Sequence, residues 1–444
     1  MGNTRETSDS QIVSTRQRRI AELANQMQGA GITSLNHHLD LVWMREAYRR
    51  TRKDGAVGVD GQTAAEYEKD LEKNLRDLIE RTKAGRYHAP PVKRGYVPKG
   101  EHELRPIGIP TLEDKVLQRA VVMLLEPIYE QEFMNCSYGF RPKRSAHDAL
   151  NTLWKSTNEQ GGCWILDADI RKYFDSVDRN QMQEFVRKRV RDGIVGRLIG
   201  KWLNAGVMEE GELYYPESGT PQGGVISPML SNIYLHEVLD QWYESEVHRR
   251  LTGRSFLIRF ADDFVMGFER EADAQRVLEV IGKRFERFHL KLHTEKTRIV
   301  DFRRPKAEAR GATFEFLGFC HYWGRSRKGR RIVKQKTASS RLTRSLKRIA
   351  DWCRVHRHDP LVDQQRALGL KLRGYYNYFG LTGNYRCLER FYRGVCLRWF
   401  RWLKRRSRLR NLTWDLFSRL RARYALPFPR VVHSIYLRSG ESSS

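Results

Sequence analysis

Residues 255–268 read SFLIRFADDFVMGF, and this stretch decides the fold. Two apolar runs, 255–261 and 264–268, are separated only by Asp262 and Asp263. Short apolar runs divided by a polar pair predict a β-hairpin with both acids at its turn. A buried carboxylate without a partner costs several kcal/mol, so acids at the end of a buried strand indicate a bound positive charge. The alternative is ordinary turn chemistry, in which Asp simply favours the bend.

A third acid ends another predicted strand. Residues 163–170 read CWILDADI, and Asp169 lies at the end of this apolar run. Mg²⁺ is usually held by one or two carboxylates together with substrate phosphates. Two such ions about 4 Å apart can activate an attacking hydroxyl and stabilise a leaving pyrophosphate. Because adjacent strand residues point to opposite faces, we expect Asp169 and Asp262 to be the principal ligands and Asp263 a supporting one.

Composition bounds the class of protein. The chain has 444 residues, 40% of them hydrophobic and 11% aromatic, which is enough for two or three domains with real cores. A mean hydropathy of −0.65 and the lack of any apolar run of about 18 residues predict no membrane span. The polar N-terminus has no secretory signal pattern. None of the six cysteines forms a C-x-x-C pair, so the sequence supports neither a zinc ribbon nor a thiol-exchange site. Scattered cysteines of this kind favour a reducing, cytoplasmic location.

Charge is distributed unevenly. The chain carries 81 Lys and Arg against 53 Asp and Glu, a net charge of +28. Residues 1–319 hold 50 of these bases against 47 acids, whereas residues 320–444 hold 31 against 6. A nearly neutral body followed by a basic segment predicts a catalytic part joined to a module that binds a polyanion. A basic tail of the ribosomal kind and a helix lying on a membrane surface are the alternatives.

Periodicity and turn signals predict the other elements. Helices are expected over residues 11–27, 39–50, 64–82, 112–129, 179–188, 272–288, 339–354, 360–378 and 385–406, with helical stretches within 222–243. Further strands are expected over residues 87–110, 290–300 and 313–322. After Arg325 the sequence pattern becomes that of long basic helices, so the main domain boundary is expected at about residues 321–335.

Two further stretches suit nucleotide binding. Residues 219–235 read GTPQGGVISPMLSNIYL, a tight loop that runs into an apolar helix, so its backbone could pass close to a base or template. Lys99 and Arg105 flank a short loop. This pair suits a triphosphate, because Arg offers a fork of donors and Lys a point charge.

Seven blocks, in order over about residues 40–435, resemble group II intron-encoded reverse transcriptase/maturases, of the compact bacterial type without an endonuclease. Residues 169–175 resemble motif A, 219–235 motif B and 260–263 motif C, while 105–110 and 138–142 are similar to the fingers, and 292–297 and 316–319 to later motifs. Phe260 departs from the pattern, since Tyr is commoner there. The departure does not touch the expected metal ligands.

The resemblance implies an α+β, right-hand polymerase fold. Fingers and an RRM-like palm with an antiparallel sheet would be followed by an α-helical thumb or maturase domain. The implied division is a helical N-terminal extension (1–60), fingers and palm (61–330), thumb or maturase domain (331–410) and a short basic tail similar to a DNA-binding region (411–444). No cysteine-pair and histidine cluster of an HNH nuclease follows, so we expect no second-strand nicking activity.

The resemblance also implies roles for individual residues. Asp169, Asp262 and Asp263, with Ile170, would bind two Mg²⁺ ions. Phe174 would lie beneath the incoming sugar and clash with a 2′-hydroxyl, the alternative being ordinary core packing. Lys99, Arg105, Gln222 and Lys296 would contact the nucleotide, and Lys296 would protonate pyrophosphate unless it is merely a solvated lysine. The primer grip would be Phe316, Leu317 and Gly318. The RNA-binding set would be Arg390, Arg393, Arg398, Arg401, Lys404, Arg405 and Arg406.

The function implied is RNA-directed DNA synthesis combined with maturase activity. The protein would bind its group II intron RNA to assist splicing and copy it from dNTPs, using the 3′ end of a DNA target as primer. Homodimerisation is left open, and no membrane partner is expected. The alternatives are a free-standing relative in a defence or CRISPR-linked system, and a splicing-only maturase with a vestigial polymerase. The intact Asp169, Asp262 and Asp263 argue against the last.

Overall fold

The computed structural model describes residues 2–99, 103–215, 223–306, 309, 311–406 and 412–434. Contacts group the chain into two compact units. The first comprises Met1–Ala146 and Leu166–Ile299, and the second comprises His147–Ile165 and Val300–Ser444. The functional boundaries expected at residues 60, 330 and 410 stay predictions.

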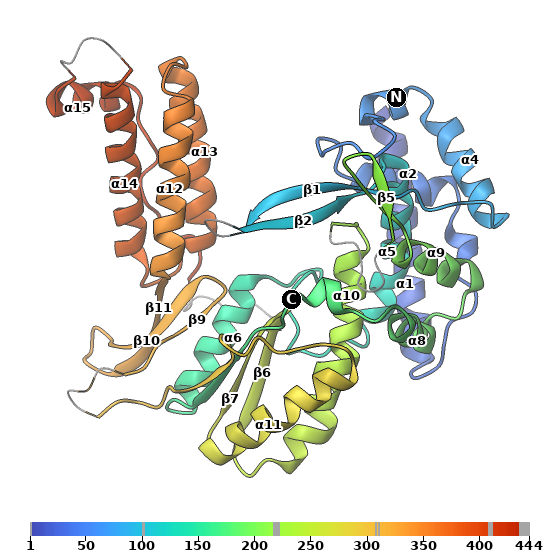
Figure 1. Cartoon of the computed structure of the whole chain (residues 1–444), viewed down its shortest axis with the longest axis horizontal. Helices are drawn as coiled ribbons and strands as arrows, with labels where there is room; N and C mark the ends of the chain where they lie inside the picture. Colours follow the sequence, from blue (N-terminus) through green and yellow to red (C-terminus); the bar gives the residue numbers. More distant parts are fainter. Residues whose placement is uncertain are drawn as a thin grey trace. The chain divides into compact units, whose positions relative to one another are not determined.

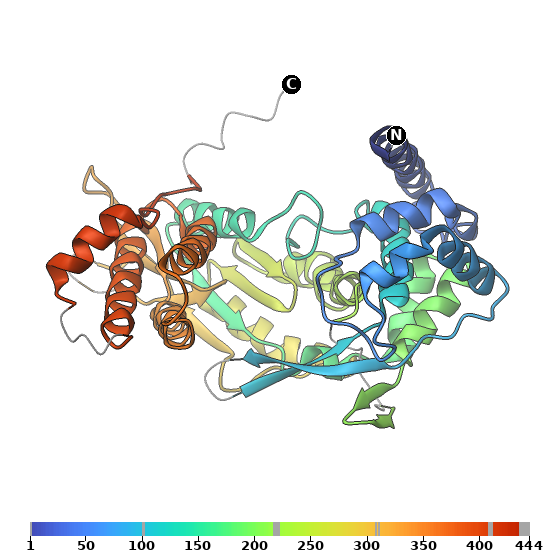
Figure 2. The same cartoon turned by 90° about the horizontal axis from the view of Figure 1, so that it is seen from above.

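The first unit starts with a group of helices. These are α1 (Gly2–Gln26), α2 (Leu41–Arg50), α3 (Ala64–Lys69), α4 (Leu71–Lys83) and α5 (Leu112–Tyr129). The prediction of a single helix over residues 64–82 is wrong, because Asp70 is not helical and separates α3 from α4. Thr111 caps α5 by accepting a hydrogen bond from the backbone of Asp114. α1 and α2 pack on α5, most of whose side chains are buried (Figure 2).

A sheet of order β2-β1-β4-β5 extends from this group. Its strands are β1 (Val92–Lys99), β2 (Glu103–Ile109), β4 (Val207–Glu209) and β5 (Glu212–Tyr214). β1 and β2 form the long antiparallel hairpin visible in Figure 1, which confirms the extended structure predicted for the proline-rich stretch. Proline suits such an edge hairpin, because it cannot donate to a central ladder.

The second sheet has the order β6-β7-β3-β8. Its strands are β3 (Trp164–Ala168), β6 (Ser255–Phe260), β7 (Asp263–Phe268) and β8 (Arg298–Asp301). The apolar face of α11 (Glu271–Arg287) packs against β7 (Figure 1). The predicted hairpin is confirmed, since β6 and β7 pair antiparallel. The strand expected over residues 290–300 is mostly wrong, because regular pairing begins only at Arg298.

Short helices connect the sheets. They are α7 (Tyr173–Ser176), α8 (Arg179–Arg189), α9 (Gly193–Leu203) and α10 (Ser227–Leu235), and α10 continues into the π-helical turn His236–Asp240. The sequence did not predict α9, whose three glycines lower its helix propensity. Buried Asp192 nevertheless starts α9, because its carboxylate accepts hydrogen bonds from the backbones of Ile194 and Val195.

The second unit contains α6 (Ala146–Glu159) and a sheet of order β11-β10-β9. Its strands are β9 (Phe314–Phe316), β10 (Phe319–Arg325) and β11 (Arg331–Thr337). The one strand expected over residues 313–322 is therefore two. Leu317 and Gly318 form the turn between them, both with positive φ, as in the two-residue turns that suit twisted hairpins.

Helices α12 (Ser339–Val355), α13 (Leu361–Phe379) and α14 (Tyr385–Lys404) lie side by side in this unit (Figure 1 and Figure 2). They confirm the predicted helical segment. Trp399 is fully buried among them and donates a 2.9 Å hydrogen bond to Gln364. α15 (Trp414–Arg423) adds Phe417 to the same core, so the described part of the predicted tail packs on these helices.

Buried His321 on β10 gives the second unit a dependence on pH. Its ring stacks on Phe314 at 4.7 Å, and burial lowers its pKa to about 3. Below about pH 6.5 the His321 ring binds a proton in the unfolded chain but not in the folded chain. Stability therefore falls as pH decreases from 6.5 to 3. We expect His321 to lower the free energy of unfolding by about 2 kcal/mol when the pH falls from 7.5 to 5.

Urea unfolding at the two pH values checks this expectation. In His321→Phe the decrease in unfolding free energy between the two pH values should be about 2 kcal/mol smaller than in wild type. The control His358→Asn, which replaces an exposed histidine, should show the wild-type decrease. An equal loss in wild type and His321→Phe would contradict the assignment.

Within the described ranges, no helix is long and apolar enough to cross a membrane. No disulfide joins the six cysteines in the described part of the chain; three of them are buried and three half-buried.

Candidate active site

The two neighbouring acids occupy different positions at the β6–β7 turn. Phe260 pairs with Asp263, so Ala261 and Asp262 form the two-residue turn. Ala261 has a φ of 57°, where such turns ordinarily place glycine. Asp262 is half-buried and Asp263, the first residue of β7, is exposed. Strand alternation therefore does not force the two carboxylates apart, because only one of them belongs to a strand.

Asp169 directly follows β3, the strand beside β7. Its backbone carbonyl accepts a 2.8 Å hydrogen bond from His293, and Arg171 donates one of 2.8 Å to Lys291. These two bonds flank the bridge between Ile170 and Leu292. The Ile170 carbonyl consequently points to the other side of its strand, away from Leu292.

Lys296 reaches the first of the candidate metal ligands. Its Nζ lies 2.8 Å from Oδ2 of Asp169, and its side chain is 56% exposed. The ammonium group thus compensates the Asp169 charge from the solvent side. The resemblance implied that Lys296 contacts the nucleotide. In the structure Lys296 contacts Asp169, which is itself expected to lie near that nucleotide.

Helix α7 ties the segment after Asp169 to α10. The buried Tyr173 hydroxyl donates to the Ser231 carbonyl at 3.1 Å. Burial raises the pKa of Tyr173, and the charge of Asp262 adds to the increase. Phe174 packs edge-on against Tyr173 at 5.2 Å and is only half-buried. Its ring therefore keeps exposed surface instead of disappearing into the core.

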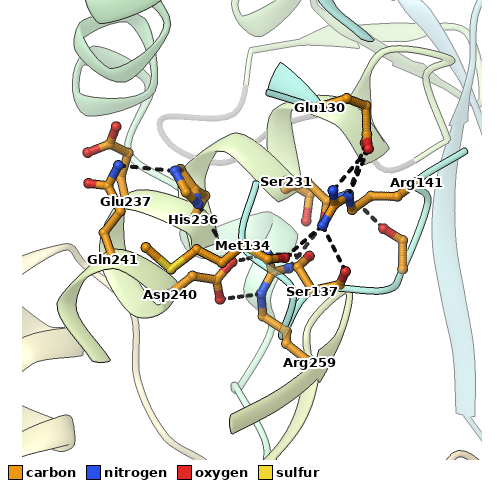
Figure 3. Close-up of polar contacts among 12 residues, drawn as sticks. Glu130, Met134, Ser137, Arg141, Ser231, His236, Glu237, Asp240, Gln241 and Arg259 are labelled. Carbon is orange, nitrogen blue, oxygen red and sulfur yellow. Dashed lines mark hydrogen bonds and ion pairs between the residues drawn. The ribbon is translucent and has the colours of Figure 1, made fainter. Parts of the chain in front are cut away.

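A fully buried arginine, Arg259, donates a hydrogen bond to the acid-bearing turn, and its contact with Asp240 is drawn in Figure 3. Arg259 Nε and Nη2 contact the two oxygens of Asp240 at 2.8 and 2.5 Å. Nη1 donates to Asn232 Oδ1 at 3.0 Å and to the Ala261 carbonyl at 3.1 Å, and Nη2 also donates to Ser137 Oγ at 2.8 Å. Burial alone would lower the pKa of Arg259, but the charge and hydrogen bonds of Asp240 raise it. Sequence analysis missed this residue, although a cation inside an apolar strand was a usable signal.

The segment before α6 braces the same turn. Tyr138 donates to the Arg259 carbonyl, and Arg259 donates to the Cys136 carbonyl, both at 2.8 Å. A Cβ on Gly139 would lie 2.3 Å from the Ala261 nitrogen, so only glycine permits this backbone contact. Arg141 holds the segment by donating to the Ser137 carbonyl at 3.0 Å and pairing with Glu130 (Figure 3).

The glycine-rich loop is described from Gly223 onward, so Gln222 lies outside the described residues. Gly223 has a φ of 118°, and a Cβ there would lie 2.5 Å from the Gly108 carbonyl oxygen. The Ile226 nitrogen donates to Gln118 Oε1 at 3.2 Å, and Gln118 donates to Asp114 at 3.0 Å. Burial raises the pKa of Asp114 to about 6. Buried side chains of α5 thus fix the loop in front of α10.

The residues expected to hold nucleotide phosphates are only partly described. Arg105 is exposed on β2, whereas Lys99 has a described backbone in β1 and a side chain outside the described part. No sequence pattern predicted the polar cavity of about 390 Å³ that lies beside the residues directly following Asp169. It is lined by Arg171, Lys172, Asp175, Ser176, Asp178, His289 and Lys291.

The acids offer the oxygen ligands that Mg²⁺ prefers. Within the described ranges, no three His, Cys, Asp or Glu side chains are gathered so as to enclose a metal ion. Mg²⁺ usually keeps several waters and substrate phosphates among its ligands, so two carboxylates and a carbonyl are a suitable protein share. Asp169, Asp262 and the Ile170 carbonyl could supply that share, with Asp263 beside them.

In the second unit, the hairpin turn and α14 carry the remaining predicted residues. The Leu317 carbonyl accepts from Tyr378 at 2.9 Å, and the Gly318 carbonyl from Ala338 at 3.0 Å. Along α14 an exposed stripe repeats every three or four residues: Arg386, Arg390, Arg393, Leu397, Arg401 and Lys404. Arg398 lies off this stripe, half-buried, and donates to the Gly394 carbonyl. Exposed Arg405 and Arg406 follow the helix, and Arg406 donates to the Asp359 carbonyl.

Acids at the ends of adjacent strands, a half-buried ring after the first of them and a close-packed glycine loop define a nucleotidyltransferase palm. The family model described as reverse transcriptase (RNA-dependent DNA polymerase) matches residues 97–321. The chain belongs to this family. Domains of this kind generally use divalent metal ions.

Curated relatives agree with that assignment. The chain is 36% identical to Protein YkfC of Escherichia coli K12 over 293 residues, 58% of this chain and 76% of that protein. It is 42% identical to the Group II intron-encoded protein LtrA of Lactococcus lactis over 169 residues, 38% of this chain and 28% of that protein. It is 33% identical to Nuclear intron maturase 1, mitochondrial, of Arabidopsis thaliana over 90 residues, 20% of this chain and 12% of that protein. The matched segment thus spans just over a quarter of LtrA.

Proposed function

We propose that this protein is an RNA-directed DNA polymerase that also binds group II intron RNA, assists its splicing and copies it into DNA from a primer at a DNA target. The observation that carries the proposal is that Asp262 and Asp263, at the β6–β7 turn, lie next to the strand β3, which Asp169 directly follows. Similarity to an intron-encoded protein and to an intron maturase supports the RNA partner.

Each residue of the palm has a proposed task. Two Mg²⁺ ions held by Asp169, Asp262, Asp263 and the Ile170 carbonyl would supply activation of the primer hydroxyl and stabilisation of the leaving pyrophosphate. Arg105, with Lys99 and Gln222, would orient the nucleotide, and positioning of this kind carries much of the catalysis of phosphoryl transfer. Lys296, already at Asp169, would give a proton to the pyrophosphate.

Primer extension tests the polymerase proposal directly. Purified protein with Mg²⁺, poly(rA)/oligo(dT) and dTTP should extend the primer, and omission of the divalent ion should stop it. Inert wild-type protein under these conditions would overturn the proposal and leave the splicing-only maturase. The hairpin turn Phe316–Gly318 would hold the primer, so Leu317→Ala should weaken primer binding more than nucleotide binding.

The exposed stripe of α14 is the proposed RNA-binding face. Each arginine that neutralises an RNA phosphate releases counterions, so binding weakens with salt in proportion to the number of contacts. The variant in which Gln replaces Arg390, Arg393 and Arg401 should have a shallower slope of log affinity against log salt, with its magnitude reduced by about 2. Truncation near residue 330 is less suitable, because it would separate β10 from β11.

Filter binding of structured intron RNA at several salt concentrations measures this slope. The matched control replaces Arg276, Lys283 and Arg287, exposed cations on α11, by Gln. An unchanged slope in the α14 variant, or the same loss in the α11 control, would contradict the proposed face.

Three narrower proposals accompany this function. The substrates would be dNTPs, intron RNA and a DNA primer, and light scattering would determine whether the chain forms a homodimer. Six scattered cysteines, three of them buried, support a reducing, cytoplasmic location. A free-standing role in a defence system would instead be indicated by defence genes, and not intron RNA domains, beside the gene.

A further inference from the structure

The buried guanidinium of Arg259 serves the acid-bearing turn more than its own strand. Its five N–H donors all have acceptors, and one of these is the carbonyl of Ala261, the residue directly before Asp262. Arg259 and Asp240 are both 0% exposed. A buried pair of this kind is a poor source of stability, because both charges lose their hydration. Its retention in a core therefore points to a role in specifying geometry.

The acceptors come from parts of the first unit that are distant in sequence. Asn232 lies on α10, behind the glycine-rich loop, and its amide nitrogen also donates to the Gly139 carbonyl at 2.7 Å. Ser137 belongs to the bracing segment, and Asp240 ends the π-helical turn that follows α10. Such turns insert an extra residue into a helix and are frequent at functional sites. Figure 3 shows Ser137 and Asp240 both converging on Arg259.

The turn itself needs an external restraint. Ala261 has positive φ, a conformation that a side chain bearing a Cβ disfavours. The Arg259 hydrogen bond to its carbonyl and the Gly139 backbone against its nitrogen oppose relaxation from two sides. Without them the turn could relax and carry the Asp262 carboxylate away from the Asp169 side.

We propose that the buried Arg259–Asp240 pair is a positioning device that holds the Ala261–Asp263 turn in the geometry for binding divalent metal ions and links it to α10. This inference rests on the proposed polymerase function. It adds Arg259, Asp240 and Asn232 to the machinery as positioning residues, because none of them is expected to touch substrate.

Two measurements on the full chain separate positioning from folding. The first is Mn²⁺ affinity, followed by the electron paramagnetic resonance of free Mn²⁺ without nucleic acid. The second is steady-state primer extension, giving kcat, KM for dTTP and the half-saturating Mg²⁺ concentration. Arg259→Lys keeps the charge but loses the fork that reaches both Asp240 and Ala261.

For Arg259→Lys we expect Mn²⁺ affinity to fall about 10-fold and kcat about 100-fold, while KM for dTTP stays near the wild-type value. The matched control is Arg189→Lys. Arg189 is also buried and bonded to carbonyls, at Ala24 and Met27, but it does not contact the turn. Its variant should change melting temperature without changing Mn²⁺ affinity or kcat per folded molecule.

A double variant keeps the test valid if the single one folds poorly. Arg259→Met with Asp240→Leu replaces the pair by apolar side chains, an exchange that can leave a fold intact. It should melt near the wild-type temperature and still lose Mn²⁺ affinity and kcat. Wild-type metal affinity in either folded variant would overturn the positioning role. If Mn²⁺ affinity depends on Arg259 as expected but the wild-type protein never extends a primer, the proposed function alone would be overturned.

Discussion

Asp262→Asn should abolish DNA synthesis while leaving the protein folded and bound to RNA. The substitution keeps the size of the side chain in the turn but removes the negative charge that a divalent ion requires. Because charge stabilisation in the transition state is the main contribution of such a site, we expect kcat to fall by at least about 1,000-fold. Primer extension in Mg²⁺ measures the loss, and circular dichroism verifies the fold.

Splicing provides the second readout for the same variant. Binding and splicing of intron RNA should continue, because the proposed RNA face lies on α14, in the other compact unit. Asp54→Asn is the control, since Asp54 is exposed and pairs with Arg52 outside the palm. Retained synthesis in Asp262→Asn would remove this acid from the metal site. Loss of splicing together with synthesis would show that the two activities share the palm.

Phe174→Ala should relax the choice of sugar. The half-buried ring, fixed by Tyr173 and through it by Ser231, would occupy the space that a 2′-hydroxyl needs. Removal of the ring should lower the preference for dTTP over UTP, as a ratio of kcat/KM values, by about 100-fold. Synthesis from dTTP itself should change less, because the metal ligands are intact.

The size of the ring, and not its chemistry, is the variable in this prediction. Phe174→Tyr keeps the bulk and should keep the preference for deoxynucleotides. Single-nucleotide insertion with dTTP and UTP gives both ratios. An unchanged ratio in Phe174→Ala would return the residue to the alternative role of packing, and a large drop in melting temperature would support that role.

Local chemistry explains which elements could be predicted. The β6–β7 hairpin follows from two apolar runs around two acids, and helices α12, α13 and α14 follow from their 3.6-residue periodicity. The breaks were harder to predict. The pattern continues through Asp70, so the boundary between α3 and α4 leaves no gap in the apolar positions. Likewise the turn at Leu317 and Gly318 lies inside an apolar run, with only one glycine to signal it.

The candidate site shows the same division. Asp169, Asp262 and Asp263 were identifiable because each acid interrupts an apolar pattern. The contact of Lys296 with Asp169 joins residues 127 positions apart, which no local pattern encodes. Arg259 meets Ser137 across 122 positions in the same way. These pairs form only when packing has closed long loops, so they depend on the whole core and not on the adjacent sequence.

By itself the sequence determined the β6–β7 hairpin, the long basic helices of the second unit, the acids at strand ends and the concentration of basic charge after residue 319, because each depends on neighbouring residues alone. Only the tertiary structure decided that Asp262 lies in a turn held by a buried Arg259–Asp240 pair, and which arginines of α14 form one exposed stripe. The physical reason is burial. A charge becomes structural when the fold removes its water and supplies a partner, and that partner is chosen by packing in three dimensions.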